Sequence, residues 1–454
     1  MTGDDKLSAQ GNSMSRRQFL HRAGMTAAGA GLMAAASRHR VRAGTGRYRT
    51  VLIGSGWWGM NILRDALASG ECQAVALCDV DQRHLNEAVD EVEDLTGDRP
   101  AAYTDYREML EQEHPDIAIV GTPDHWHCLN TIDAVKAGAH VFVEKPVGHT
   151  IKEGRAMVNV AREADRVVQV GTHRRASPHN MSAMEFLREG NAGRIGMVRS
   201  FVHYHGGPES PQPNEEPPDE LDWDMWCGPA PLRPFNSRIH PRGFRNFMDY
   251  ANGQLGDWGI HWMDQILWWT DENYPKRVSS TGGRLIRGEP VLNEDEQTSD
   301  GPDTQVATFE FEDFVATWEH RQYAGNDAEN HNIGCYFYGT EGTLHLGWLD
   351  GWTFYPSDPN AEEIHEEPTL HTNDHHNIPE LWDDFMESIK NGRKPICDIE
   401  LGHYSTNMSL LGMLSLNVGR SLEWDGENEE VIDDPEANAL LSREYRGDWE
   451  YPEV

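Results

Sequence analysis

The feature that most restricts the fold of this 454-residue chain is a glycine-rich turn that follows a short apolar run. Residues 48–53 read YRTVLI and lead into Gly54, Gly56 and Gly59, which have the spacing G-x-G-x-x-G, before a helical run over 60–69. In such a strand-turn-helix unit the first glycine permits the tight turn, and the second lets the backbone approach a pyrophosphate. The third allows close packing of the helix on the strand. The pattern predicts a dinucleotide-binding α/β unit.

A second apolar run, residues 73–78, ends in an acidic residue, Asp79, at 25 positions after the first glycine of the turn. A carboxylate there accepts hydrogen bonds from the adenosine ribose and repels a 2′-phosphate, so it favours NAD over NADP as the cofactor. A solvated turn acid is the alternative interpretation of Asp79. Arg83 follows at helical distance and is expected to stack on the adenine or, as the less favoured alternative, to weaken the preference for NAD. Trp57 and Trp58 stand inside the glycine turn and complete the predicted cofactor contacts on this side.

Two later strand-like runs end in polar residues. Residues 116–121 precede Thr122 and Pro123, and residues 139–143 precede Glu144 and Lys145. The carboxyl ends of parallel strands meet at one edge of the sheet, where ligands bind in open α/β folds. These four residues and His127 are therefore expected to share one cofactor-binding crevice.

The glycine turn, Thr122-Pro123 with His127, and Glu144-Lys145-Pro146 together resemble the Gfo/Idh/MocA oxidoreductase family over about 48–424. That family includes glucose-fructose oxidoreductase and inositol dehydrogenase. The resemblance implies an α/β protein with an N-terminal Rossmann domain and a C-terminal α+β domain that has a large open, mostly antiparallel sheet. It implies that Lys145 contacts both the nicotinamide ribose and a substrate hydroxyl, and that the protein is a homo-oligomer. Asp124 departs from the Asn that related sequences commonly carry.

The same resemblance extends to Asp257 and His261, which lie four positions apart at the start of a helical run. Residues at this spacing share one face of a helix. A carboxylate beside an imidazole orients the ring, which suits His261 as the general base that removes a hydroxyl proton. The alternative is a helix-capping Asp257 with a buried structural His261.

In the second half of the chain, alternating runs predict an antiparallel sheet; they span 197–205, 304–311, 314–320, 335–338 and 343–346. Arg174, Arg245 and Tyr250 are candidate substrate contacts. Trp223 and Trp226 either stack on a sugar or fill the core, and packing is slightly favoured.

The charge balance excludes one class of partner. A net charge of -36 arises from 75 acidic and 39 basic residues, and only 7 of the basic residues are lysine. Nucleic-acid binding needs clustered positive charge, so it is not expected. The acidic, lysine-poor composition fits a halophile-like surface or an ordinary acidic protein.

The six cysteines contain no C-x-x-C pair and are expected to be free thiols. No metal is predicted, since the histidine-rich stretch 371–376 is typical of a solvated acidic loop.

The amino terminus carries the pattern of a twin-arginine signal. Arg16 and Arg17 precede a weakly apolar run over 23–36, with small-residue cleavage sites near 36 and 43. A basic amphipathic helix is the alternative. The predicted organisation is a signal peptide over 1–43, a Rossmann domain over 47–170, a substrate-binding and oligomerisation domain over 171–425 and a loosely held acidic tail over 426–454. The mature protein is expected to be periplasmic or extracellular and to lack a membrane span.

These features predict an NAD(P)-dependent oxidoreductase that acts on a CH-OH group of a small sugar, cyclitol or glycoside. Lys145, His261 and Asp257 would carry the chemistry. Because free NAD is scarce outside the cytoplasm, an exported enzyme is expected to hold its cofactor tightly. Two alternatives remain: an NAD-dependent glycoside hydrolase that oxidises its substrate only transiently, and a carbohydrate-binding protein without catalysis.

Overall fold

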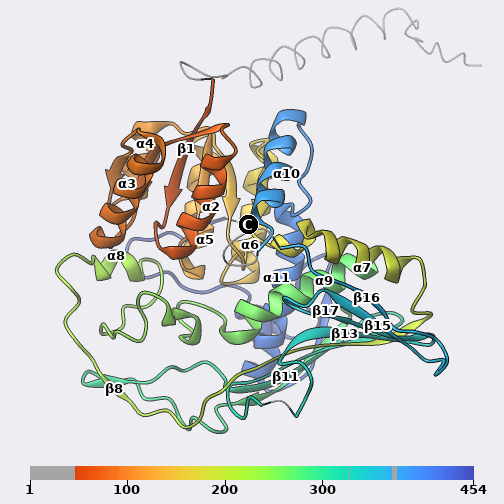
Figure 1. Cartoon of the computed structure of the whole chain (residues 1–454). Coiled ribbons are helices and arrows are strands. Elements are labelled where there is room, and N and C mark those ends of the chain that lie inside the picture. Colours follow the sequence, from red (N-terminus) through yellow and green to blue (C-terminus); the bar gives the residue numbers. More distant parts are fainter. Residues whose placement is uncertain (1–45, 327, 371–375, 454) are drawn as a thin grey trace, which may run out of the picture. The chain divides into compact units, whose positions relative to one another are not determined.

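The computed structural model describes residues 46–326, 328–370 and 376–453. The predicted signal segment and residues 371–375 of the histidine-rich stretch lie outside the described residues. The described chain contains two large sheets and the helices that cover them (Figure 1).

The first sheet has six strands in the order β3-β2-β1-β4-β5-β6, and β1 with β4, β2 with β3, β4 with β5 and β5 with β6 pair in parallel. This is the doubly wound order of dinucleotide-binding folds. Its central strands are continuous apolar runs because both faces are covered: Val51, Leu52 and Ile119 are fully buried. The strands are β1 (Tyr48–Ile53), β2 (Cys72–Cys78), β3 (Ala101–Tyr103), β4 (Ile117–Val120), β5 (His140–Val143) and β6 (Val168–Val170).

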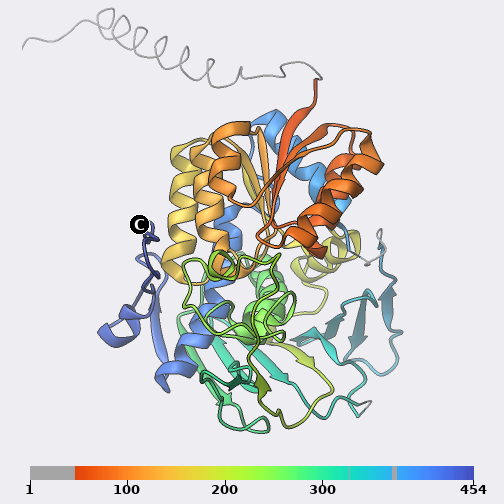
Figure 2. The same cartoon turned by 90° about the vertical axis from the view of Figure 1, so that its left-hand side faces the viewer.

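Helices lie on both sides of this sheet, as Figure 2 shows. They are α2 (Trp57–Ala68), α3 (Gln82–Thr96), α4 (Tyr106–Glu113), α5 (His127–Lys136) and α6 (Ile151–Glu163). A much later helix, α10 (Ile378–Asn391), also packs against α2. A helix from the second half of the sequence therefore packs against the domain formed by the first half.

The second sheet has ten strands in the order β16-β15-β14-β13-β7-β12-β11-β9-β17-β18. Its pairings are antiparallel except that between β7 and β12, so the expectation of a large, mostly antiparallel sheet is confirmed. The strands are β7 (Ile195–His203), β9 (Arg277–Gly283), β11 (Thr304–Glu310), β12 (Val315–Arg321), β13 (Ile333–Gly339), β14 (Gly342–Leu346), β15 (Trp352–Pro356), β16 (Ile364–Glu366), β17 (Leu422–Asp425) and β18 (Glu430–Val431).

One face of this sheet packs on helices α7 (Pro178–Arg188), α9 (Ile260–Thr270) and α11 (Ile399–Val418). The alternation of buried and half-buried residues along β12 follows the two-residue period of a strand. Shorter elements complete the chain: η1 (Asp124–Trp126), η2 (His173–Ala176), β8 (Gln212–Pro213), α8 (Trp223–Cys227), η3 (Gly243–Asn246), η4 (Leu255–Gly259), β10 (Glu296–Gln297) and α12 (Pro435–Ala439).

The six cysteines are buried and unbridged, which confirms the expectation of free thiols. Among the described helices, none is both long enough and apolar enough to cross a membrane.

The acidic tail is held more firmly than the sequence predicted. Arg443 and Tyr445 both bond the Glu153 carboxylate, at 3.0 and 2.8 Å. The Tyr451 hydroxyl lies 2.7 Å from the Thr150 hydroxyl. Glu153 is fully buried and also closes the capping box at the start of α6. Although the composition of the tail is polar, hydrogen bonds from Arg443, Tyr445 and Tyr451 to residues of α6 and its N-cap attach it to the rest of the protein.

Candidate active site

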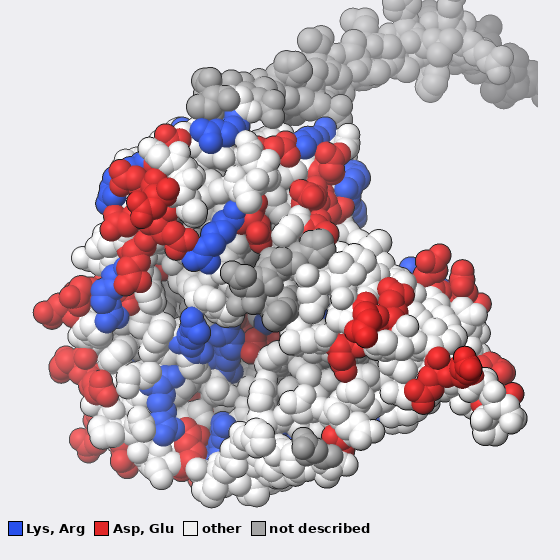
Figure 3. Space-filling model, in the orientation of Figure 1, with Lys and Arg blue, Asp and Glu red and all other residues white. Residues whose placement is uncertain are grey.

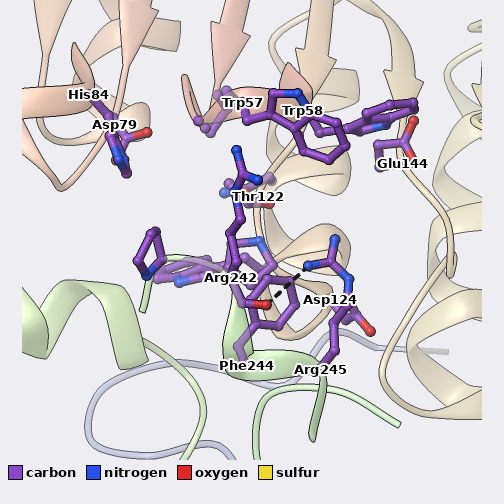
Figure 4. A pocket seen from close by; sticks show the side chains of 18 of the residues that line it. Trp57, Trp58, Asp79, His84, Thr122, Asp124, Glu144, Arg242, Phe244 and Arg245 are labelled. Atoms are coloured by element: carbon purple, nitrogen blue, oxygen red, sulfur yellow. Dashed lines mark hydrogen bonds between the residues drawn. The ribbon is translucent and has the colours of Figure 1, made fainter. Parts of the chain in front are cut away.

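A pocket of about 490 Å³ lies along the carboxyl edge of the parallel sheet. It contains most of the predicted cofactor and catalytic residues and one predicted substrate contact, Arg245; the others are Gly54, Gly56, Trp57, Trp58, Asp79, Thr122, Pro123, Glu144, Lys145, Asp257 and His261. Figure 3 shows Lys and Arg atoms gathered in a hollow near the middle of one face, while Asp and Glu atoms lie mainly towards its margins. The close view in Figure 4 shows residues of the glycine turn opposite residues from the segment around Arg242 and Arg245.

In the glycine turn, neighbouring backbone atoms lie so close to Gly54 and Gly59 that neither position can hold a side chain. Gly54 has φ +87°, and a Cβ there would lie 2.8 Å from the backbone of Gly121; a Cβ on Gly59 would lie 2.1 Å from the Gly54 oxygen. Gly59 therefore packs behind the pocket rather than lining it. A Cβ on Gly56 would meet nothing within 4 Å, because it faces open space.

Gly56 is also the N-cap of α2, where no side chain caps the helix and no acid occupies the first turn. Backbone N–H groups at such a helix start carry partial positive charge and bind phosphate. Open space at Gly56 and these uncapped N–H groups suit the diphosphate of a dinucleotide, so the residues present fit the cofactor that the sequence predicts.

Asp79 is fixed in the pocket as a hydrogen-bond acceptor. One carboxylate oxygen accepts from the Ser55 backbone N–H at 2.8 Å and from its hydroxyl at 3.1 Å, and the other accepts from the Asp81 N–H at 2.9 Å. Burial raises the pKa of Asp79, while these donors favour its ionised form. Its place beside the glycine turn fits the predicted contact with the adenosine ribose.

Asp79→Ser is expected to reduce the preference for NAD over NADP by about tenfold or more, since hydrogen bonds to a charged group contribute about 1.5–3 kcal/mol. The measurement is the ratio of the two dissociation constants by titration calorimetry. Asp90→Ser, at an exposed position on α3, is the control. An unchanged ratio in Asp79→Ser would contradict the role of this carboxylate.

Lys145, Arg245 and Asp257 form an ion cluster at the other end of the pocket. Lys145 Nζ lies 2.7 Å from Asp257 Oδ1 and 2.9 Å from the Asp257 backbone oxygen, and Arg245 Nε lies 3.1 Å from the same Oδ1. Burial disfavours the ionised form of Asp257, but the two cations outweigh it and hold the pKa of this carboxyl below its ordinary value. The carboxylate thus fixes the position of the ammonium.

Asp257 and His261, which the sequence predicts to pair, form no hydrogen bond with each other; Asp257 Oδ1 is bonded by Lys145 and Arg245. Residues 255–259 form a π-helical turn, so the four-residue spacing no longer aligns the two side chains as it would in an α-helix. Asp257 faces Lys145 and Arg245 instead.

His261 lies among rings rather than beside a carboxylate. Its ring centroid is 5.0 Å from that of Trp348 and 5.2 Å from that of His173, and Nδ1 is buried without a hydrogen-bond partner. Burial, with a smaller contribution from Lys145, lowers the pKa of His261 well below its ordinary value. The imidazole is therefore neutral near pH 7, the form in which one ring nitrogen can accept a proton.

Two residues that were predicted to contact the cofactor instead form hydrogen bonds within the walls of the crevice. The His127 ring bridges the backbone oxygens of Pro146 and Thr122, at 2.6 and 2.8 Å, and so joins the two strand ends that carry the motifs. Arg83 folds back on Asp81, with its Nη2 2.7 Å from the carboxylate, instead of reaching an adenine site. Neither side chain lines the pocket.

Two predicted substrate contacts are likewise outside the pocket. Arg174 donates to the Gly347 oxygen at 2.6 Å and lies 4.7 Å from the Trp348 ring centroid, so it supports the pocket wall from behind. Tyr250 is fully buried, and its hydroxyl donates to the Pro231 oxygen at 3.1 Å. Trp223 and Trp226 stack on each other beside it in a small apolar core, which agrees with the packing role, although Trp226 also borders the pocket.

Several pocket residues were not predicted from the sequence: Arg242, His173, Trp348 and His376. His173 follows β6, so the strand-end argument that selected Lys145 would also have selected it. Arg242 and Trp348 come from irregular segments without a recognisable motif, and only the fold brings them to the pocket.

Asp124 is buried in the pocket near the ion cluster. Burial raises its pKa to about 7; Arg245 acts in the opposite direction, and Asp257 adds to the rise. Between about pH 4 and 7 the unfolded chain ionises this carboxyl first, so the folded state binds more protons and loses stability as pH rises.

Asp124→Asn removes this titration. The variant is expected to gain stability relative to the parent between pH 5 and pH 8.5, by up to a few kcal/mol at about 1.4 kcal/mol for each pKa unit. Urea unfolding of both proteins at the two pH values measures the difference. A stability difference that is the same at both pH values would contradict a raised pKa at Asp124.

Comparison with known proteins agrees with this geometry. Residues 48–172 match the family model described as an oxidoreductase family with an NAD-binding Rossmann fold, and residues 199–283 and 364–451 match the C-terminal alpha/beta domain of the same family. A glycosyl hydrolase family 109 protein of Akkermansia muciniphila is 30% identical over 154 residues, 33% of this chain and 32% of that protein. The match thus spans about a third of the length of this relative.

Two solved structures share the fold. The WlbA dehydrogenase of Bordetella pertussis, in complex with NADH and UDP-GlcNAcA, has 19% identity and a TM-score of 0.61 over 84% of this chain and 99% of its own. The aldose-aldose oxidoreductase of Caulobacter crescentus, complexed with glycerol, has 19% identity and a TM-score of 0.62 over 83% and 99%. Since both domain models of one family match, the chain belongs to the Gfo/Idh/MocA family of NAD-binding oxidoreductases.

Proposed function

We propose that this oxidoreductase transfers a hydride between NAD and a CH-OH group of a sugar, cyclitol or glycoside. The observation that carries the proposal is the placement of Lys145 Nζ, 2.7 Å from Asp257 Oδ1, in the same pocket as the neutral His261. An ammonium that binds a hydroxyl oxygen and a base that takes its proton both favour oxidation of an alcohol by a bound hydride acceptor.

The roles of the side chains follow from their positions. Lys145, held by Asp257, binds and orients the substrate hydroxyl. His261, which lines the same pocket, accepts the hydroxyl proton on its imidazole. Bound NAD supplies the acceptor for the hydride that leaves the same carbon. Trp258 and Trp348 offer apolar ring faces next to His261, and such faces suit the C–H surface of a sugar ring.

A specific observation favours a second candidate function. The Akkermansia muciniphila relative is named as a glycosyl hydrolase, although its match covers only part of each chain. In an NAD-dependent glycosidase, a ring hydroxyl is oxidised transiently, the aglycone is eliminated, water adds and the ring carbon is reduced again. Lys145 and His261 would serve the same proton transfers in both reactions. A closed cycle of this kind has no need for free NAD.

The test is to purify the mature protein without added nucleotide, identify any bound cofactor by its spectrum, and supply free sugars and nitrophenyl glycosides. Net formation of NADH supports the dehydrogenase. Release of nitrophenol without net NADH supports the glycosidase. Sugar binding without either product would support the non-catalytic alternative and would overturn the proposal.

We further propose that the protein is exported by the twin-arginine route and is a homo-oligomer. Arg16 and Arg17 before the weakly apolar run support the first proposal. Replacing both arginines by lysine should abolish export, because the translocation signal requires the pair. Sedimentation of the mature protein tests the second proposal, and a monomer at micromolar concentration would contradict it.

A further inference from the structure

Arg242 enters the cofactor pocket from the side opposite the glycine turn. It directly precedes η3 and lines the pocket together with Gly54 and Gly56. Its guanidinium carbon lies 4.8 Å from the ring centroid of Trp57, the first residue of α2. Figure 4 shows the Arg242 side chain extending towards Trp57 and Trp58. The two halves of the fold thus meet across the pocket at this arginine.

In the described parts of the chain the Arg242 guanidinium forms no ion pair with a carboxylate, although the protein carries a net charge of -36. Arg245, one turn further on, is paired with Asp257. Opposite Arg242 stands the uncapped start of α2, which has no acidic residue in its first turn. Two positive groups therefore face the same space, and among the described residues no carboxylate caps the helix start or pairs with Arg242.

The segment that carries Arg242 is anchored to the first domain. His240 Nε2 lies 3.0 Å from Asp81 Oδ2, and Asp81 is the N-cap of α3. Gly243 follows in a turn so tight that a Cβ would lie 1.6 Å from the Arg238 oxygen. These contacts hold the backbone on both sides of Arg242 in place.

We infer that Arg242 binds the diphosphate of the dinucleotide from the side opposite the glycine turn, and that Trp57 holds the guanidinium over it as a latch. A guanidinium is suited to this contact because its planar fork of N–H donors matches phosphate oxygens. NAD then leaves only when the Arg242 side chain swings away. The latch therefore slows cofactor release. This inference rests on the NAD site alone and is independent of the substrate.

The experiment compares ligands with and without the diphosphate. Protein freed of nucleotide is titrated with NAD, ADP and adenosine by calorimetry, for the parent and for Arg242→Gln. The variant is expected to bind NAD and ADP about ten- to a hundredfold more weakly and adenosine within about twofold of the parent, because only the first two ligands carry the anion. Arg194→Gln, at an exposed position, is the matched control and should change none of the three.

Two further measurements keep the inference falsifiable. Trp57→Leu should speed NAD dissociation severalfold in stopped-flow competition, with the adenosine affinity again unchanged. Arg242→Lys retains the charge and should recover part of the ADP affinity that Arg242→Gln loses. If Arg242→Gln does not fold, Arg242→Lys replaces it as the test variant. Equal weakening of adenosine and NAD, or no change in either, would overturn the inference. Failure of the proposed sugar chemistry would leave all these binding results intact, since none uses a substrate.

Discussion

Lys145→Met is expected to lower kcat by about a thousandfold while NAD remains bound, since a positioned proton-handling group contributes about 10²–10⁴ in rate. Methionine keeps the length and apolar stem of the side chain but removes the ammonium that orients the hydroxyl. Asp257 retains Arg245 as a partner at 3.1 Å, so the variant should fold. Single-turnover reduction of bound NAD measures the rate, and the cofactor content after denaturation measures occupancy.

Lys276→Met, which removes a surface lysine that is paired with Glu312, is the control for this variant and should retain full activity. If Lys145→Met turned over at the parental rate, the assignment of Lys145 would fail. If it lost activity together with its NAD, Lys145 would be a cofactor-retention residue instead.

Glu153→Ala is expected to reduce the free energy of unfolding by about 3–5 kcal/mol, the usual effect of removing one partner from a buried ion pair. Glu153 is fully buried, and its loss would leave the Arg443 guanidinium without its carboxylate. It would also remove the capping box of α6. Urea unfolding measures the change.

Glu163→Ala, at an exposed position near the end of the same helix, should change stability by less than about 0.5 kcal/mol. The double variant Glu153→Ala/Arg443→Ala should recover part of the loss, because it leaves no unpaired buried charge. A loss below about 1 kcal/mol in Glu153→Ala would show that the tail contributes little to the stability of the body.

The parts of the site that could be predicted from the sequence are those fixed by local geometry. Gly54, Asp79 and Lys145 each stand at the end of a parallel strand, and the order of such a sheet brings its carboxyl ends together whatever the rest of the chain does. The family resemblance then gave the fold of the second domain and indicated Asp257 and His261.

The remaining features of the site depend on tertiary interactions that cannot be inferred from the spacing of residues in the sequence. The four-residue spacing of Asp257 and His261 predicts a shared helix face, but a π-helical turn and two competing cations direct Asp257 away from the imidazole. Arg242 reaches the pocket from an irregular segment whose position depends on contacts with the other domain. Such contacts are decided by three-dimensional packing, which local propensity does not determine.

The attachment of the tail has a consequence for how the protein acquires its structure. The bond from Arg443 to the His125 oxygen spans 318 residues, and that between Tyr451 and Thr150 spans 301. Contacts of such long sequence separation form slowly, because the entropy of closing the loop is lost before the contact can stabilise it. His125 lies next to Asp124, so this end of the crevice is expected to become ordered late in folding. A refolding experiment should therefore show secondary structure well before NAD binding appears.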